Sequence, residues 1–558
     1  MTNDSRAPAP RTLAAVGLLS AAMLAFELTL TRLFAITQFY HFAFMAVSLA
    51  LLGSGAAGSL LSVWPSLRAY PGWWAAAFTV AALLSYALLN FAPFDSYAIA
   101  WDRRQVLYLV LSFAGAALPF LFSGLAVGGL LATDAANLHR VYAANLAGSA
   151  VGALGALPLL SELGGEGALF ASAAAGLAAA GLFPPAAGGP NRAARRAGLA
   201  LGVLALLALA VLRPAPLKLR LSPYKALSQA LLAPDARHTV SEWSTLARVD
   251  VVESRSIHSM PGLSQNALIA EPPLQAGLTL DGDNLQPLTA LDADSDLAQT
   301  LAANVPEAIA GALRPDAQAT LILEPGAGWS PLMALAGGAP AVTVAERNPM
   351  VTDVLQGRYA AFTHGLYLHP RATVLTGEGR RVARGAGPAY EVVIVALSDS
   401  FHPVTSGAYS LSEDYRYTVE ALNDALDALT PGGVLVLTRW LQTPPTEGLR
   451  TLATVEAALR ARGVAEPAQH IGAFRSLRTM TFVVTLEPLS AADRAAFRSF
   501  AASRGYDVVW LPDVSPGEVN QHNRLPEPIY YRAFSALLAD PEGTIRAYPY
   551  DIRPATDN

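Results

Sequence analysis

The N-terminal 213 residues are dominated by long apolar runs, whereas the rest of the chain alternates short apolar runs with polar segments. A bilayer core is crossed by a helix of roughly 20 apolar residues. About seven runs approach that length, at residues 12–34, 39–63, 72–93, 105–131, 141–160, 166–184 and 197–212. Because further spans follow the first run, it is not a cleaved signal peptide. The pattern predicts a helical transmembrane domain over residues 1–213.

The remaining chain has the pattern of a soluble α/β protein. From about residue 317, short strand-like runs alternate with helical segments, which is typical of a doubly wound parallel sheet. We expect a linker and small β-rich domain over residues 214–316, with strands at 248–253 and 278–280. A Rossmann-like domain over 317–465 and an α/β extension over 466–558 follow. We also expect residues 412–429 to form a helix that Ser412 caps.

One stretch of the α/β region has the order strand, glycine turn, helix, strand and acid. Gly326 and Gly328 permit a tight turn after the first strand, and Ser330-Pro331 favours a helix start there. Glu346 ends the second strand, where a carboxylate can accept both ribose hydroxyls of a nucleoside. The third glycine of the dinucleotide fingerprint is absent. Order and spacing therefore predict a nucleoside-cofactor site held by Glu324, Gly326, Ala327, Gly328 and Glu346.

Later strands of the same sheet bring further polar residues to its carboxyl edge, where ligands bind in such folds. Gly377 and Glu378 follow the third strand, Asp399 follows the fourth, and Arg439 ends the fifth. We expect these residues to share one rim with Glu324 and Glu346.

Composition narrows the choice of partners. The formal net charge is −5, and no block of Lys and Arg interleaves with aromatic residues, so a nucleic-acid partner has no support. Absence of cysteine excludes a disulfide framework and a thiolate nucleophile. The aspartates at 281–296 suggest a calcium loop, but Leu297 and Ala303 stand where its Gly and Glu belong. We predict no metal site, and interpret these aspartates as solvated turns or as an acidic rim that attracts a cation.

Inside the membrane domain, Glu27, Thr31 and Arg32 are polar residues within the first span. Glu27 and Arg32 lie about 140° apart on a helix and need partners on other helices, unless they mark a substrate or ion pathway. Gly148, Gly152 and Gly155 predict a face for close helix packing. Loop charges do not decide the orientation. Because nucleoside cofactors are cytoplasmic, we expect the C-terminal half inside and, with seven spans, the N-terminus outside.

These motifs together resemble the bacterial membrane-spanning spermidine synthase-like proteins, in which a multi-span region precedes an aminopropyltransferase-type domain of the class I S-adenosylmethionine (SAM) fold. The resemblance covers nearly the whole chain. It rests on the segments 27–32, 222–224, 324–328, 346, 377–380, 390–399, 409–417 and 430–433. It implies an integral protein of the bacterial inner membrane and SAM or decarboxylated SAM as the cofactor. The ending at 554–557 looks like a point where longer relatives continue.

The resemblance also implies site roles. Soluble spermidine synthases carry an aspartate where this chain has Ala396, so Asp399 is our prediction for the base or amine anchor. Tyr409 and Glu413 are weaker catalytic predictions on the same rim. Lys225 replaces the family's glutamine, and we expect it to pair with the carboxylate of intact SAM or to face the anionic membrane surface.

The function classes left open are a transferase and a binding protein. A transferase would move an aminopropyl group, or a methyl group if it is a SAM-dependent methyltransferase, to a small-molecule acceptor with an amine. A non-catalytic transport or sensor protein is the alternative, favoured by Ala396 and by Glu27 and His41 in the spans. An NAD-dependent dehydrogenase is disfavoured by the incomplete fingerprint. The sequence leaves the oligomeric state open, a homodimer included.

Overall fold

The structure is a computed structural model that describes residues 9–38, 40–96, 98–133, 137–184, 192–399 and 414–558. The chain forms two compact units. One is built from the residues up to 228 together with residues 242–248, and the other from most of the remaining chain.

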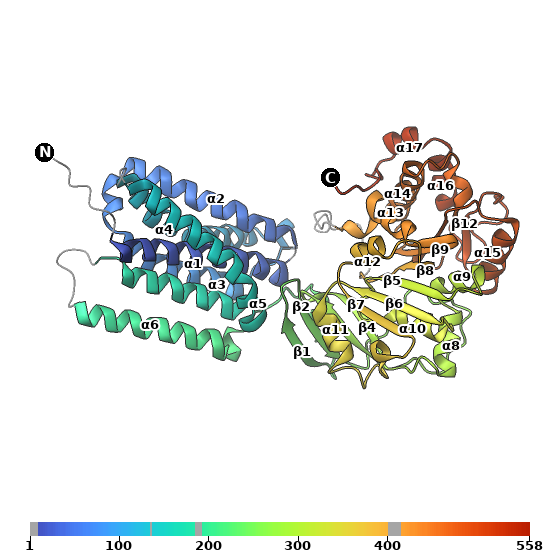
Figure 1. The fold of residues 1–558 in the computed structure, drawn as a ribbon, viewed down its shortest axis with the longest axis horizontal. Coiled ribbons are helices and arrows are strands. Elements are labelled where there is room, and N and C mark those ends of the chain that lie inside the picture. Colours follow the sequence, from blue (N-terminus) through green and yellow to red (C-terminus); the bar gives the residue numbers. More distant parts are fainter. Residues whose placement is uncertain (1–8, 39, 97, 134–136, 185–191, 400–413) are drawn as a thin grey trace. The chain divides into compact units, whose positions relative to one another are not determined.

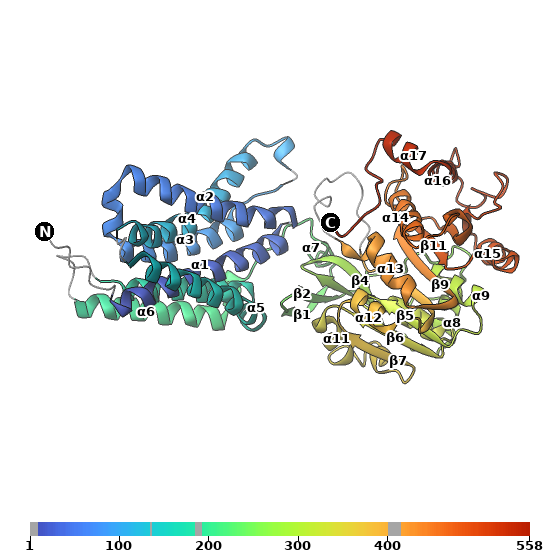
Figure 2. The same ribbon diagram turned by 45° about the horizontal axis from the view of Figure 1, so that its top comes forward.

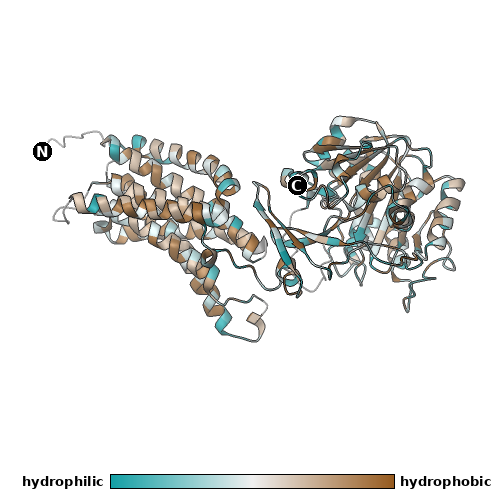
Figure 3. Ribbon diagram, turned by 90° about the horizontal axis from the view of Figure 1, so that it is seen from below, coloured by the Kyte–Doolittle hydropathy of each residue, from teal (hydrophilic) through white to brown (hydrophobic). Residues whose placement is uncertain are grey.

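The first unit is a bundle of long helices (Figures 1 and 3). Among the described residues, six helices are long and apolar enough to cross a membrane. They are α1 (Pro10–Thr37), α2 (Tyr40–Val63), α3 (Pro71–Phe91), α4 (Arg104–Thr133), α5 (Leu138–Leu182) and α6 (Arg192–Leu212). Several large apolar side chains point outward, among them Leu51 at 71% and Leu154 at 72% exposure. Such an apolar exterior is what a lipid bilayer covers.

We expected about seven separate membrane-spanning helices, and the described residues form six long apolar helices. The runs at 141–160 and 166–184 form the single 45-residue helix α5, whose backbone breaks at Gly164 with φ 67° and ψ 178°. Only glycine adopts this conformation readily. Trp243 covers the break, because a Cβ at Gly165 would lie 2.5 Å from its ring.

The two halves of α5 run in opposite directions along α1. In the first half, Gly148 lies against Gly17 and Gly152 lies against Ala21, so this half runs parallel to α1. In the second half the chain returns. Gly165 lies against Leu33, and Gly176 lies against Phe78, whose ring is 6.0 Å from that of Phe26. The break at Gly164 therefore reverses the chain, as the two separate runs had suggested.

The second unit begins with a four-stranded sheet in the order β1-β2-β3-β4. Its strands are β1 (Arg237–Trp243), β2 (Arg248–Glu253), β3 (Gln275–Leu280) and β4 (Asp283–Thr289), which confirms strands at 248–253 and 278–280. Asp281 and Gly282 join β3 to β4 with φ values of 52° and 71°. Two positive φ values are typical of a type I′ hairpin turn, for which Asp-Gly is favoured. Asp281 thus lies in a turn but is buried, so it is not the solvated residue expected, while Asp283 begins β4 and Asp296 begins the helix α8 (Asp296–Ala303).

An eight-stranded sheet follows, in the order β12-β10-β11-β9-β8-β5-β6-β7 (Figure 2). Five strands are parallel: β5 (Ala319–Leu323), β6 (Ala341–Glu346), β7 (Ala372–Thr376), β8 (Tyr390–Val395) and β9 (Leu429–Trp440). The others add antiparallel: β10 (Ile471–Arg475), β11 (Thr479–Thr485) and β12 (Asp507–Trp510). This confirms the doubly wound fold. The sheet also continues through the expected boundary at residue 465.

Alternate residues of the strands face two apolar cores. Ile322 and Ile394 belong to one core with α9 (Ile309–Leu313), α10 (Trp329–Ala336), α11 (Pro349–Gln356) and α15 (Ala491–Ser503). Leu321 and Val393 belong to the other with α12 (Gly379–Ala386), α13 (Val419–Asp427), α14 (Glu447–Ala461) and α16 (Ile529–Ala539). Helices therefore cover both faces, which leaves the strand ends as the place for a ligand. The shorter helices are α7 (Ala226–Ala230), α8 (Asp296–Ala303) and α17 (Pro541–Ala547).

The predicted N-cap residues begin their helices in the structure, with two exceptions. Ser490 forms a complete capping box with Asp493, and Asn348 accepts from the Met350 N–H. Helix α10, however, is capped by Gly328 and not by Ser330, whose hydroxyl donates to Glu307. Helix α13 is capped by Thr418, while the expected cap Ser412 lies outside the described residues.

Candidate functional site

The candidate site lies at the carboxyl ends of β5, β6, β7, β8 and β9. Strand β5 is flanked by β6 on one side and by β8 on the other. The chain therefore winds in opposite directions from β5. In open α/β sheets, ligands bind at the crevice outside this switch point.

The glycine turn after β5 is held by strained backbone and by close packing. Glu324, Gly326 and Gly328 all have positive φ, of 49°, 58° and 90°. A Cβ on Gly326 would lie 1.8 Å from Gln286 Oε1, so no side chain fits there. The Gly326 N–H donates to Glu346 Oε2 at 3.0 Å. The turn and the acid that sequence spacing predicted are thus in direct contact.

Glu346 is buried at the end of β6 and both of its carboxylate oxygens accept backbone hydrogen bonds. Oε2 accepts from Gly326, and Oε1 accepts from the Asn348 N–H at 2.8 Å. Burial raises the pKa of Glu346 to about 7, although the two N–H donors act in the opposite direction. Each oxygen retains a second lone pair for a ligand hydroxyl. Its role as a ribose ligand stays a prediction.

Gln286 of β4 is a residue that the sequence analysis missed. Its Oε1 accepts from the Ala327 N–H at 2.8 Å, and its Nε2 donates to the Ser398 carbonyl after β8. It thereby joins the glycine turn to the end of β8. Tyr367 adds a second unpredicted contact, because its hydroxyl donates to the Gly326 carbonyl at 3.2 Å. No local motif marks either residue.

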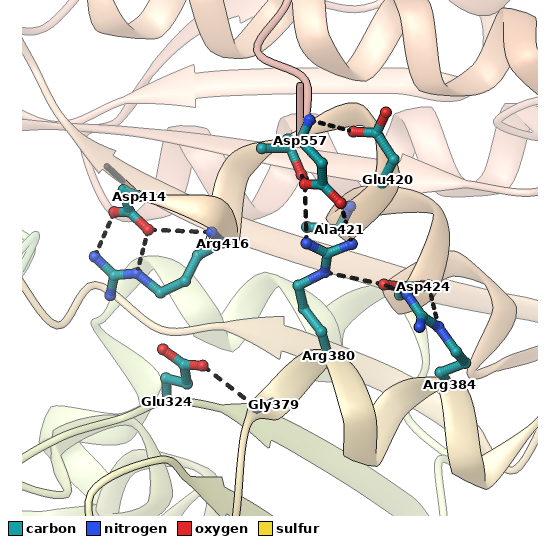
Figure 4. A network of polar contacts seen from close by, with 11 residues as sticks. Glu324, Gly379, Arg380, Arg384, Asp414, Arg416, Glu420, Ala421, Asp424 and Asp557 are labelled. Carbon is teal, nitrogen blue, oxygen red and sulfur yellow. Dashed lines mark hydrogen bonds and ion pairs between the residues drawn. The ribbon is translucent and has the colours of Figure 1, made fainter. Parts of the chain in front are cut away.

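The loop after β7 also reaches the glycine turn. The Gly377 N–H donates to the Glu346 carbonyl at 2.8 Å, and the Gly379 N–H donates to Glu324 Oε1 at 3.3 Å (Figure 4). Glu378 lies between them, exposed, at the N-cap position of α12. The structure thus brings Glu324, Glu346 and this loop together.

Asp399 and Arg439 lie at the ends of β8 and β9. Arg439 Nη1 is 3.7 Å from Asp399 Oδ2, and the Trp440 indole N–H donates to the Asp399 carbonyl at 2.7 Å. The Arg439 guanidinium lies 3.8 Å from the centre of the Tyr417 ring. Asp399 therefore has a cation beside it, which the sequence analysis placed on the same rim without foreseeing the pairing.

Arg416 is a further residue that sequence reasoning missed. It forms two hydrogen bonds with the Asp414 carboxylate, of 2.8 and 2.7 Å (Figure 4), and a third with the Ser398 hydroxyl. Its charge also lowers the pKa of Glu346, against the larger effect of burial. Arg416 thus contacts the end of β8 and acts on Glu346 through its charge.

Three predicted residues are not brought to this site by any described contact. Tyr409 and Glu413 lie outside the described residues. Lys225 belongs to the helical unit, where it is buried and its ammonium donates to the Ala35 carbonyl at 3.1 Å, in the last turn of α1. A cation there interacts favourably with the helix dipole. Its role as a cofactor ligand stays a prediction.

No family model matches the chain, and no curated protein matches it. Solved structures show a distant similarity of the C-terminal half to spermidine synthases. One, in complex with the transition-state analogue AdoDATO, has 16% identity over 56% of this chain and 86% of its own, at a TM-score of 0.31. The spermidine synthase from Thermotoga maritima has 15% identity over 56% and 87%, at 0.31. A probable spermidine synthase from Corynebacterium glutamicum has 16% identity over 49% and 91%, at 0.32.

Proposed function

We propose that this protein is a membrane-embedded transferase that binds SAM or decarboxylated SAM in its α/β unit. It transfers an alkyl group, aminopropyl or methyl, to a small-molecule acceptor. The observation that carries the proposal is the contact between Glu346 Oε2 and the Gly326 N–H at the switch point of the sheet. A carboxylate at the end of the second strand, bonded to the glycine turn, suits the ribose of a nucleoside.

The described residues fit such a ligand in two respects. Glu346 ends β6 at the carboxyl edge of the sheet, and it retains acceptor capacity on both oxygens. SAM would supply a carbon activated by its positive sulfur. The chain's own task is then to align the acceptor and to take a proton from the attacking amine. We propose Asp399 for the second task, because one of its carboxylate oxygens is buried without a hydrogen-bond partner among the described residues.

Calorimetry on the purified full-length protein tests the proposal. The probes are SAM, decarboxylated SAM and 5′-methylthioadenosine, which share the nucleoside. Glu346→Ala should cost about 2–4 kcal/mol of affinity for all three, or roughly 30-fold to 1,000-fold. Asp294→Asn is the control, since Asp294 is 70% exposed and its ion-pair partners, His369 and Arg371, are not residues of the candidate site. Wild type that binds none of the three probes contradicts the proposal.

A ligand sensor without turnover is a second candidate function. It is favoured by Ala396, a buried apolar residue directly after β8, at the position where the spermidine synthases that the chain resembles carry an aspartate. Binding of the nucleoside probes without consumption of SAM in the presence of amine acceptors would favour the sensor. Release of methylthioadenosine or S-adenosylhomocysteine would favour the transferase.

We further propose that the helical unit crosses the inner membrane and that the α/β unit lies in the cytoplasm, where nucleoside cofactors occur. Support comes from the six long apolar helices and their exposed apolar side chains. If both halves of α5 cross, the reversal at Gly164 gives seven passes, and with the α/β unit inside we propose that the N-terminus lies outside.

A further inference from the structure

The guanidinium of Arg439 is buried and only partly used. Its side chain is 12% exposed, it lies over the Tyr417 ring, and Nη2 donates to Glu447 Oε2 at 3.1 Å. Nε and Nη1 are buried and have no hydrogen-bond partner among the described residues. Asp399 Oδ2 lies too far from Nη1, at 3.7 Å, to accept a hydrogen bond. Nε and Nη1 lie on different edges of the guanidinium, so each is left to donate to another group separately.

Two further polar atoms close to Arg439 also lack hydrogen-bond partners. Asp399 Oδ1 and the Tyr417 hydroxyl are buried and make no hydrogen bond within the described part of the chain. Buried polar atoms without partners are rare in folded proteins, because their desolvation is not compensated. Several of them side by side, at the carboxyl ends of neighbouring strands, indicate a place that a polar ligand occupies.

The neighbouring cation does not share this property. Arg416 donates from Nε and Nη2 to Asp414 and from Nη1 to Ser398. Among the described residues, Arg439 is thus the arginine of this cluster with nitrogen atoms that make no hydrogen bond. The ion pairs of this cluster join two arginines to three acids. Arg416 and Arg439 carry two positive charges, and Asp399, Asp414 and Glu447 carry three negative charges, so the cluster has a net formal charge of −1.

This charge pattern selects a ligand. A simple anion would increase the negative charge, and a simple amine would leave the free Arg439 donors without an acceptor. A group with both charges satisfies both sides, because a guanidinium N–H forms a charge-assisted hydrogen bond with a carboxylate and a carboxylate accepts from an ammonium.

We infer that Asp399, Arg439 and Tyr417 bind an α-amino acid group, with its ammonium on Asp399 and its carboxylate on Arg439. The inference rests on the proposed function and adds a specificity to it. The same chemistry has two sources: the methionyl part of intact SAM, in which case Asp399 anchors the cofactor and is not the base, or an acceptor that is itself an amino acid. In either case Arg439 selects for a carboxylate that a plain diamine and decarboxylated SAM both lack.

Matched ligand pairs separate the two sources. SAM and decarboxylated SAM differ only in the α-carboxylate, and so do L-ornithine and putrescine. We would titrate the first pair into full-length protein, and the second pair into protein saturated with 5′-methylthioadenosine. Wild type should bind the carboxylated member of one pair at least tenfold more tightly, and Arg439→Gln should reduce that ratio to about one. Arg478→Gln, which removes an exposed arginine, should leave the ratio unchanged.

Methylthioadenosine provides the check on folding, because it lacks the amino acid group and Arg439→Gln should bind it like wild type. If that variant does not fold, Arg439→Lys is the alternative, because it retains the positive charge without the planar guanidinium. It should lower the ratio of the two affinities severalfold. A preference in the SAM pair assigns the site to the cofactor, and a preference in the ornithine pair assigns it to the acceptor. Wild type that discriminates in neither pair, or a ratio that survives Arg439→Gln, overturns the inference. Failure to bind methylthioadenosine at all contradicts the proposed function instead.

Discussion

The carboxylate of Asp557 accepts two parallel hydrogen bonds from the guanidinium of Arg380, of 2.9 and 2.8 Å, across 177 residues of sequence (Figure 4). The Thr418 hydroxyl donates to the same carboxylate at 2.7 Å, and Arg380 Nε donates to Asp424 at 3.0 Å. Arg380 follows Gly379, whose N–H meets Glu324 in the candidate site. The last residues of the sequence are thus tied to the loop that borders the glycine turn.

Loss of this pair should loosen helix α12 and the loop before it. Asp557→Ala removes three hydrogen bonds to a carboxylate that is 31% exposed, and we expect about 1–3 kcal/mol of lost stability in the α/β unit. Hydrogen exchange of residues 377–386 should accelerate accordingly. The exposed pair of Asp551 with Arg553 is the control: Asp551→Asn should change stability by less than about 0.5 kcal/mol. Equal exchange in both variants would show that the Arg380 contact contributes nothing to the loop.

Ligand affinity should depend on pH through Glu346. Burial raises the pKa of its carboxyl to about 7, and the ionised form is the better acceptor for ribose hydroxyls. The affinity for methylthioadenosine should therefore increase about tenfold between pH 6 and pH 8. Glu346→Gln should bind more weakly and without this dependence. A pH dependence that persists in Glu346→Gln would assign the titration to another group.

Stability should show the opposite trend. Burial also raises the pKa of Glu307 to about 7, and its Oε2 has no hydrogen-bond partner among the described residues. A carboxyl whose pKa is raised in the folded state favours folding while it is protonated, below about pH 4.5, and this contribution is lost as pH rises through 7. The difference corresponds to roughly 3 kcal/mol. Denaturation of Glu307→Gln should be less sensitive to pH, while its affinity for methylthioadenosine matches wild type.

Packing of α1 on α5 should tolerate no side chain at Gly152. A Cβ there would lie 2.3 Å from the Ala21 carbonyl oxygen, whereas a Cβ at Gly155 meets nothing within 4 Å. Gly152→Leu should therefore reduce the folded yield in detergent severely, and Gly155→Leu should resemble wild type. Size-exclusion profiles and thermal aggregation measure the difference. The expected packing face thus contains Gly148 and Gly152, but Gly155 lies beside it. Similar yields of both variants would contradict close packing at this face.

Membrane topology can be tested without altering the background, because the chain contains no cysteine. Single cysteines at Ala9 and Asn558 should react with impermeant maleimide on opposite faces of the membrane, with Asn558 accessible only after permeabilisation. A cysteine at the exposed Glu162, next to the break at Gly164, should behave like Asn558, since Gly165 packs against Leu33 near the end of α1. Labelling of Ala9 and Asn558 on the same face would mean an even number of crossings.

Short-range signals were sufficient for much of this architecture. The apolar runs predicted the long helices, because a bilayer-length helix requires a continuous apolar segment whatever its neighbours are. The turn at Gly326 and the acid at Glu346 were found from spacing alone, since the backbone geometry at a strand end depends on adjacent residues. The same holds for the capping box of Ser490.

Contacts between distant residues could not be predicted in this way. Gln286 reaches Ala327 and Ser398 only because β4 lies beside the large sheet, and Arg439 faces Asp399 only because β9 pairs with β8. The strands after residue 465 join the same sheet because β11 pairs antiparallel with β9, and β10 and β12 extend the sheet from β11. The tie of Asp557 to Arg380 likewise follows from chain folding. Hydrogen bonds and ion pairs form wherever the fold brings complementary groups together. A local sequence pattern does not show which residues, far apart in the chain, come close in space.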